Sequence, residues 1–228
     1  GSKSDATVER NYGGGPKGPP LFFCRSRWMS PEGALEYNSR VSETSQSPGP
    51  ALVAGRSCDG CTLCCKVLNI GSLRKPRNVW CQHCDIGNGC MIYEQRPGEC
   101  RDFYCTYRVS PELGEEWKPS VSKMVVNFES GIRRVNVSVD PDFPGAWQRD
   151  PYYGQLKAMA LHLLRGQGHL LVWEGDEPIA ILPNRDVRLG PGRDNIIVVR
   201  GRSTPTGEDY DAVSLAPDDP RLREFTQS

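Results

Sequence analysis

The sequence carries no excess of charge and no long apolar run. Its 228 residues contain 28 lysines and arginines against 28 aspartates and glutamates, so the formal net charge is zero. Extended binding to nucleic acid or to an anionic membrane needs a basic surface, so neither partner is expected. No apolar stretch approaches the ~18 residues of a membrane span. We therefore expect a soluble, cytoplasmic protein without a membrane-spanning segment.

Familiar catalytic motifs are also absent. The chain has three histidines, and no P-loop, H-E-x-x-H pair, G-x-G-x-x-G loop or nucleophile motif occurs in it. His162 is expected on the solvent side of a helix, and His169 at the start of a strand without a partner. Asp140, Asp142 and Asp150 lie beside prolines and are expected to form turns. Outside its cysteines, the sequence gives no support for an enzyme.

Cysteine is absent after position 105 and concentrated before it. Nine of the ten cysteines fall in the 48 residues that end there, while Cys24 stands alone and is not assigned as a ligand. The nine candidate ligands are Cys58, Cys61, Cys64, Cys65, Cys81, Cys84, Cys90, Cys100 and Cys105. Such clusters form disulfides, a structural metal site or a catalytic or redox metal centre.

Disulfides are the weaker explanation of this cluster. The clustered count is odd, Cys64 and Cys65 are adjacent, and the polar opening residues do not read as a secretory signal. In a C-x2-C turn, two thiolates converge on one ion at ~2.3 Å for zinc. Cys58, Cys61 and Cys64 can face one centre, with Cys65 directed elsewhere, and Cys81-x2-Cys84 forms a second knuckle. With the remaining three cysteines, the set suffices for two four-ligand sites and one spare thiol.

Soft thiolates favour zinc, cuprous copper or iron–sulfur clusters. Structurally bound zinc in closed, all-sulfur sites is our first expectation, because paired C-x2-C knuckles suit such sites. An iron–sulfur cluster is the alternative, since C-x2-C-x2-C resembles the run that holds three corners of a four-iron cluster, although the usual C-x3-C-P continuation is missing. His83 lies inside the second knuckle, but its backbone position directs it away from the flanking pair.

The cluster resembles the YkgJ-like CxxCxxCC family, described as zinc- or iron-chelating proteins. The resemblance rests on Cys58-x2-Cys61-x2-Cys64-Cys65 and on the run from Gly89 to Phe103, which matches C-x-I-Y-x-x-R-P-x-x-C-R-x-F. It implies a bound metal. Some relatives are labelled flagellin lysine methylases, a label that requires a donor-binding site. We therefore expect a metal-binding protein, mainly structural or an interaction module, and as the alternative an iron–sulfur or zinc enzyme acting on a peptide or small molecule.

The remaining sequence predicts an α+β protein in which the cysteine-rich module, 57–118, precedes a small, mostly antiparallel sheet with one helix, 119–202. Strands are expected at 121–128, 132–139, 169–173, 179–182, 187–189 and 196–199, and a helix at 153–166. Residues 1–56 read as a flexible N-terminal extension, in which Ser30 can cap a short helix. The apolar stretch 21–28 of this extension offers a surface for a protein partner. A polar C-terminal tail is expected over 203–228.

Overall fold

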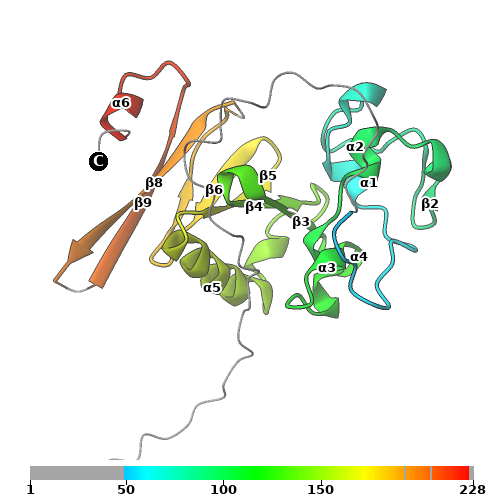
Figure 1. Ribbon diagram of the computed structural model, residues 1–228, viewed down its shortest axis with the longest axis horizontal. Helices are drawn as coiled ribbons and strands as arrows, with labels where there is room; N and C mark the ends of the chain where they lie inside the picture. Colours follow the sequence, from blue (N-terminus) through cyan, green and yellow to red (C-terminus); the bar gives the residue numbers. More distant parts are fainter. Residues whose placement is uncertain (1–48, 193, 206, 226–228) are drawn as a thin grey trace, which may run out of the picture. The chain divides into compact units, whose positions relative to one another are not determined.

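The centre of the fold is a five-stranded sheet with the order β3-β4-β5-β6-β7 (Figure 1). The computed structural model describes residues 49–192, 194–205 and 207–225. Valine, isoleucine and leucine are frequent in these strands, and branched side chains pack well on a pleated surface. The strands span Met124–Glu129 (β3), Arg134–Val139 (β4), His169–Glu174 (β5), Glu177–Ile181 (β6) and Asp186–Arg188 (β7).

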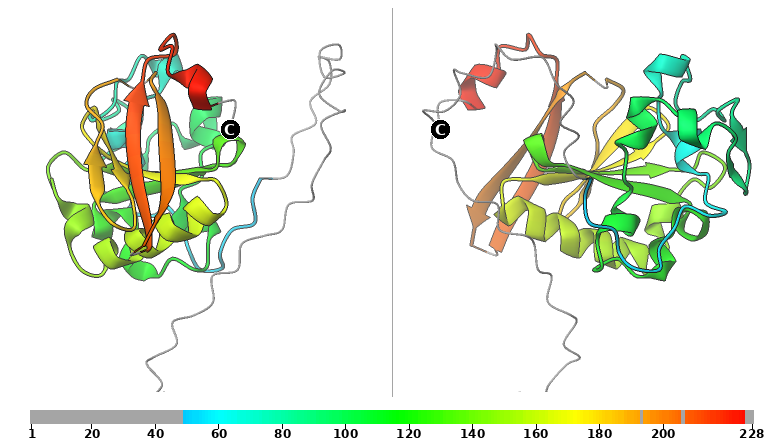
Figure 2. Two further views of the ribbon diagram at one scale, coloured as in Figure 1. Left: turned by 90° about the vertical axis from the view of Figure 1, so that its left-hand side faces the viewer. Right: turned by 45° about the vertical axis from the view of Figure 1, so that its right-hand side comes forward.

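Strands β4 and β5 are parallel, whereas the other three neighbouring pairs are antiparallel. A parallel pair needs a crossover connection, and here it contains the short η6, Ala146–Gln148, and the long α5, Tyr152–Arg165. Helix α5 buries Leu156 and Ala160 in the main core, against one face of the sheet (Figures 1 and 2). The expected α+β class and the mostly antiparallel sheet with its helix are confirmed.

Strands β8, Ile196–Thr204, and β9, Gly207–Leu215, form a separate antiparallel hairpin. Ala212 of this hairpin packs in an apolar cluster with Leu171 and Trp173 of β5. Because side chains alternate along a strand, this cluster lies on the face of the sheet that α5 does not cover. The expectation of a polar tail from residue 203 is wrong, since β9 is paired along its whole length.

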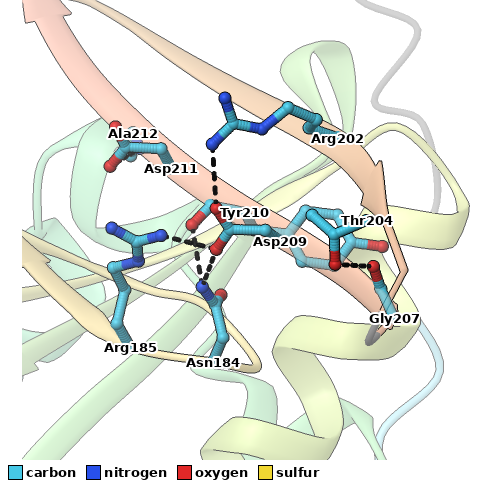
Figure 3. Close-up of polar contacts among 9 residues, drawn as sticks. All are labelled: Asn184, Arg185, Arg202, Thr204, Gly207, Asp209, Tyr210, Asp211 and Ala212. Atoms are coloured by element: carbon cyan, nitrogen blue, oxygen red, sulfur yellow. Dashed lines mark hydrogen bonds and ion pairs between the residues drawn. The ribbon is translucent and has the colours of Figure 1, made fainter.

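Asp209 of β9 is the centre of the polar contacts between this hairpin and the main sheet (Figure 3). Asn184 and Arg185, in the turn between β6 and β7, donate to its Oδ1 at 2.6 and 2.5 Å. Arg202 of β8 donates to its Oδ2 at 3.2 Å. The hydrogen bonds from the two arginines lower the pKa of the Asp209 carboxyl. Polar contacts and the apolar cluster together hold the hairpin on the sheet.

The cysteine-rich segment consists of short helices and two-residue strands. Its Leu63 and Val67 pack against Val125 of β3, so a small apolar cluster joins the segment to the sheet. Figure 1 shows α1 and α3 on the β3 side of the sheet. The elements are α1 (Cys64–Val67), η2 (Gly71–Leu73), β1 (Cys84–Asp85), β2 (Gly89–Cys90), η3 (Tyr93–Gln95), α2 (Gly98–Arg101), α3 (Thr106–Val109), η4 (Glu115–Trp117) and α4 (Pro119–Ser122). All belong to one compact unit, Pro48–Ser228.

The residues just before the cluster are fixed to it. Val53 donates its backbone N–H to the carbonyl of Arg108 at 2.9 Å. The Arg56 guanidinium donates to the carbonyls of Tyr107, Ser110 and Leu113. The expected extension, 1–56, therefore ends before Val53. The short helix expected at Ser30, the apolar stretch 21–28 and Cys24 lie outside the described residues.

Within the described part of the chain, no helix is long and apolar enough to cross a membrane. The remaining short elements are η5, Ser130–Ile132, between β3 and β4, and α6, Leu222–Phe225, after β9.

Candidate metal centre

The nine cysteines of residues 58–105 are all free thiols. In the first knuckle, the N–H of Cys61 donates to the carbonyl of Cys58 at 2.9 Å, and in the second, the N–H of Cys84 donates to that of Cys81 at 3.0 Å. Both C-x2-C motifs therefore form the tight turns expected of them. These turns bring two thiols close together without any disulfide.

The two knuckles are joined through the backbone. The N–H of Cys81 donates to the carbonyl of Cys65 at 3.0 Å, across the fifteen residues 66–80. Strands β1 and β2 then place Cys84 opposite Cys90. Three parts of the sequence that are separated by loops thus meet in one place, and their thiols meet with them.

A cavity of about 760 Å³ is lined by eight of the nine cysteines; the ninth, Cys84, does not line it. His83 also lines the cavity, and its Nε2 lies 3.2 Å from the side-chain amide of Gln82. The cysteines that line the cavity range from buried Cys81 to exposed Cys58. The sequence-predicted ligands are therefore gathered around a single space.

The larger of two thiol groups surrounds Cys65. A hydrogen bond with Cys64 and burial raise the pKa of the Cys65 thiol. The Cys65 thiol also forms a hydrogen bond with Cys84. Burial raises the pKa of Cys84 to about 12 and also raises that of Cys100, with the neighbouring thiols adding to both. The sequence placed Cys65 away from Cys64, but α1 puts the two thiols in contact.

The smaller group contains Cys58, Cys61 and Cys105. Burial raises the pKa of Cys61 and raises that of Cys105 to about 11, and the proximity of Cys58 contributes to both shifts. Cys61 therefore associates with the distant Cys105 as well as with its neighbour in the first knuckle. The raised pKa values of Cys61 and Cys105, like those of Cys65, Cys84 and Cys100, favour the thiol over the thiolate. A metal ligand must be a thiolate, so binding of a metal to these residues would release their protons.

Basic side chains stand beside these thiols. Arg108 Nη1 lies 3.1 Å from Cys58 Sγ and donates to it. Arg96 stacks over the Tyr93 ring, 3.8 Å from its centroid, and its pKa is raised through Tyr93, Cys58 and Cys90 despite the opposing effect of burial. Hydrogen-bond donors of this kind tune thiolate-bound metals.

Lys75 is a further cation near the larger thiol group and is 6 % exposed. Its Nζ donates to the carbonyls of Lys66 and Leu68. Burial lowers the pKa of Lys75, while Cys65 and Cys81 oppose that change. The position of Lys75 in the sequence gave no sign that it would lie beside the thiols.

The opposite wall of the cavity comes from the sheet, and the sequence analysis did not anticipate it. Asn127 and Glu129 of β3 and Arg134, Asn136 and Ser138 of β4 line it. They alternate with the core valines of these strands. The alternation of polar and apolar residues along β3 and β4 was the sequence pattern that could have predicted this polar face.

Asp140, Asp142 and His169, which lie outside the cysteine cluster, form no catalytic arrangement. Asp140 and Asp142 follow β4 as turn residues, and both also accept from Lys66 Nζ. His169 begins β5, and its buried Nε2 has no hydrogen-bond partner. None of these three residues lines the cavity.

Across residues 49–192, 194–205 and 207–225, no three His, Cys, Asp or Glu side chains form a group that could hold a metal ion. The fit of a metal group therefore rests on donor chemistry. Sulfur donors in a half-buried cavity, with the Arg108 guanidinium directed at one of them, are the surroundings that suit zinc or an iron–sulfur cluster. The chemistry of the donors, rather than their positions in this structure, fits such a group.

Comparisons with protein-family models, with curated proteins and with solved structures find no match for this chain. The resemblance to the YkgJ-like CxxCxxCC family therefore rests on its motif residues.

Proposed function

We propose that this protein binds a metal centre through the cysteines of residues 58–105. The observation that supports this proposal best is the cavity whose lining includes eight thiols spread along residues 58–105. Free thiols gathered in this way bind soft metals strongly. Nine free thiols also suit a reducing compartment such as the cytoplasm.

Zinc and an iron–sulfur cluster remain the two candidate groups. A single zinc ion with four thiolates at ~2.3 Å is a closed site that leaves no room beside the ion. A cavity of about 760 Å³ has room for a centre of several metal atoms. The same volume also accommodates two zinc ions, so structural zinc, as one or two ions, stays the first candidate and an iron–sulfur cluster the alternative.

An enzyme that acts on a small molecule or peptide is the second candidate function. The feature that favours it is the polar wall of the sheet, because it faces the cysteines across the same cavity. Small-molecule sites are commonly clefts of ~300–1,000 Å³ that contain a few polar groups. A purely structural site has no need of such space.

The direct test is the metal content of the full chain after anaerobic purification. Elemental analysis and visible absorption distinguish iron and sulfide from colourless zinc, and X-ray absorption identifies the ligands. We expect an all-sulfur first shell. Nitrogen or oxygen ligands at ~2.0–2.1 Å would contradict it and favour an open site.

Variants connect the metal to the cysteines. Cys61→Ser removes a half-buried thiol of the smaller group, so the protein should lose at least part of its metal. Cys24→Ser is the matched control, because we do not assign that thiol as a ligand, and it should retain the full metal content. A protein that binds no zinc, iron or copper in these assays would overturn the proposal.

A further inference from the structure

The polar wall of the cavity is built from paired residues of neighbouring strands. Asn127 of β3 stands opposite Asn136 of β4, and Glu129 stands opposite Arg134. On the same face, Val125 packs against the cysteine segment, and Leu171 of β5 packs under the hairpin. The face is thus apolar where it is covered and polar between the two covered parts.

Two residues of this polar strip are buried. Asn136 and Ser138 are 6 % and 4 % exposed. Burying such groups costs free energy unless they are hydrogen-bonded. Asn136 Oδ1 accepts from Trp173 Nε1 at 2.9 Å, so the amide oxygen of Asn136 is used and its NH₂ group remains as a donor. Asn136 therefore presents a hydrogen-bond donor to the cavity that it lines.

Arginine Nε atoms supply unused donors at the cavity. Among the described residues, the buried side-chain nitrogens without a hydrogen-bond partner are Nε of Arg96, Arg108 and Arg134 and Nε2 of His169. All three arginines line the cavity. A buried polar atom without a partner calls for an explanation, and a bound water or ion is one of the common ones.

The three arginines do not have the same neighbours. Arg108 donates to the Cys58 thiol, and Arg96 interacts electrostatically with Cys58 and Cys90. Both arginines therefore interact with thiols. Arg134 stands on the sheet instead, where its Nη2 donates to Glu129 Oε2 at 2.7 Å. The Nε–H of Arg134 is therefore a free donor that does not lie beside a thiol.

The arginines that line the cavity outnumber its carboxylates, five against three, and two of the arginines, Arg96 and Arg108, lie beside thiols. Two of those carboxylates are already engaged, Glu129 with Arg134 and Glu99 with the hydroxyl and backbone of Ser72 and with the backbone of Gly71. Arginine binds carboxylate and phosphate groups through two parallel hydrogen bonds, which makes it the usual residue for recognising them.

We infer that Arg134, with the amides of Asn127 and Asn136, binds the oxyanion of a small organic molecule. The rest of that molecule then extends across the cavity toward the cysteines. The oxyanion is a carboxylate or a phosphate, which present the same acceptors to these donors. This inference deepens the proposed function, because it places a ligand beside the metal centre.

The test is calorimetric titration of the full-length, metal-loaded protein with succinate and, separately, with inorganic phosphate. Ionic strength is held constant with chloride, so that general screening does not differ between titrations. Saturable binding is expected for at least one of the two probes. Tighter binding of succinate assigns a carboxylic acid, and tighter binding of phosphate assigns a phosphorylated molecule.

Variants locate the subsite. Arg134→Gln should weaken the binding of the preferred probe about 10-fold or more, because hydrogen bonds to charged groups contribute roughly 1.5–3 kcal/mol. Arg134→Lys keeps the charge but loses the paired donors, and should be intermediate. Asn127→Ala removes an amide without touching the ion pair. Arg188→Gln is the control, since Arg188 is 60 % exposed, does not line the cavity and pairs with Glu174 and Glu177.

Two results would overturn the inference. One is the lack of saturable binding to either probe in protein shown by elemental analysis to hold metal. The other is equal affinity of the wild type and of Arg134→Lys, Arg134→Gln and Asn127→Ala. Metal content is measured on every sample, so failure of this subsite is distinguishable from failure of metal binding itself.

Discussion

Lys66 and Asp140 form an ion pair in the interior, with Nζ and Oδ1 2.6 Å apart and side chains 5 % and 8 % exposed. Lys66 belongs to α1 in the cysteine segment, and Asp140 follows β4. Asp142 adds a second carboxylate, which is largely exposed. This contact joins the cysteine segment to the sheet, the two parts of the protein whose residues line the cavity.

Breaking this pair should destabilise the protein strongly. Lys66→Met leaves the Asp140 carboxylate buried without its partner, and removing one member of a buried pair costs about 3–5 kcal/mol. Urea unfolding monitored by circular dichroism measures the loss. Arg188→Gln breaks an exposed pair and should change stability by less than about 1 kcal/mol. A Lys66→Met protein as stable as this control would show that the pair is not needed.

Protonation of His169 should reduce stability at acidic pH. Burial and the neighbouring Arg134 lower the pKa of His169 from 6.5 to about 4, with Glu129 opposing them. The folded state therefore prefers neutral His169. Its contribution is complete above pH 6.5 and is lost as the pH falls toward 4, by up to about 3 kcal/mol.

Comparing urea unfolding of the wild type and His169→Gln at several pH values measures this effect. The variant should lose less stability than the wild type between pH 6.5 and 4. His162→Gln is the control for the general effect of removing a histidine. A NMR titration in which His169 protonates near pH 6.5 would contradict the expected burial effect.

Most elements of the sheet could be predicted because their local signals agree with their final surroundings. The apolar stripe of α5 around Leu156 faces the core, and the β3–β4 hairpin follows a run of β-branched residues. The parallel pairing of β4 with β5 was not predicted, since pairing across a crossover depends on contacts between distant parts of the chain. The spacing of the cysteines identified the thiols that line the cavity, but not which thiols would be neighbours.

The first residues of β8 were expected as a strand, 196–199, but β9 was missed for a different reason. Strand β9 includes Glu208, Asp209 and Asp211, and acidic residues are depleted in strands, so its sequence reads as a tail. Pairing with β8 and the contact of Ala212 with the β5 cluster override that local preference. Similarly, the polar residues of β4 look like the solvent side of a strand, and only the cysteine segment turns them into a cavity wall.

A charge placed under the hairpin should therefore be destabilising. Ala212→Asp puts a carboxylate at a position that is 4 % exposed and packed with Leu171 and Trp173. Burying an unpaired charge, even after its pKa shifts, costs several kcal/mol. Thermal unfolding should show the loss, and Trp173 should become more exposed, with red-shifted emission. Asp211→Ser, at the exposed neighbouring position, is the matched control. Equal stability of the two variants would indicate that the hairpin does not pack on the sheet.

The last strand of the main sheet also affects how two copies of this protein meet. Strand β7 is three residues long, and Asp186 and Arg188 at its ends carry charges. Asp186 is held by Lys157 and Tyr153, while Arg188 reaches Glu174 and Glu177. Short, charged edge strands prevent sheets from joining edge to edge. This edge therefore resists edge-to-edge pairing between the sheets of two copies.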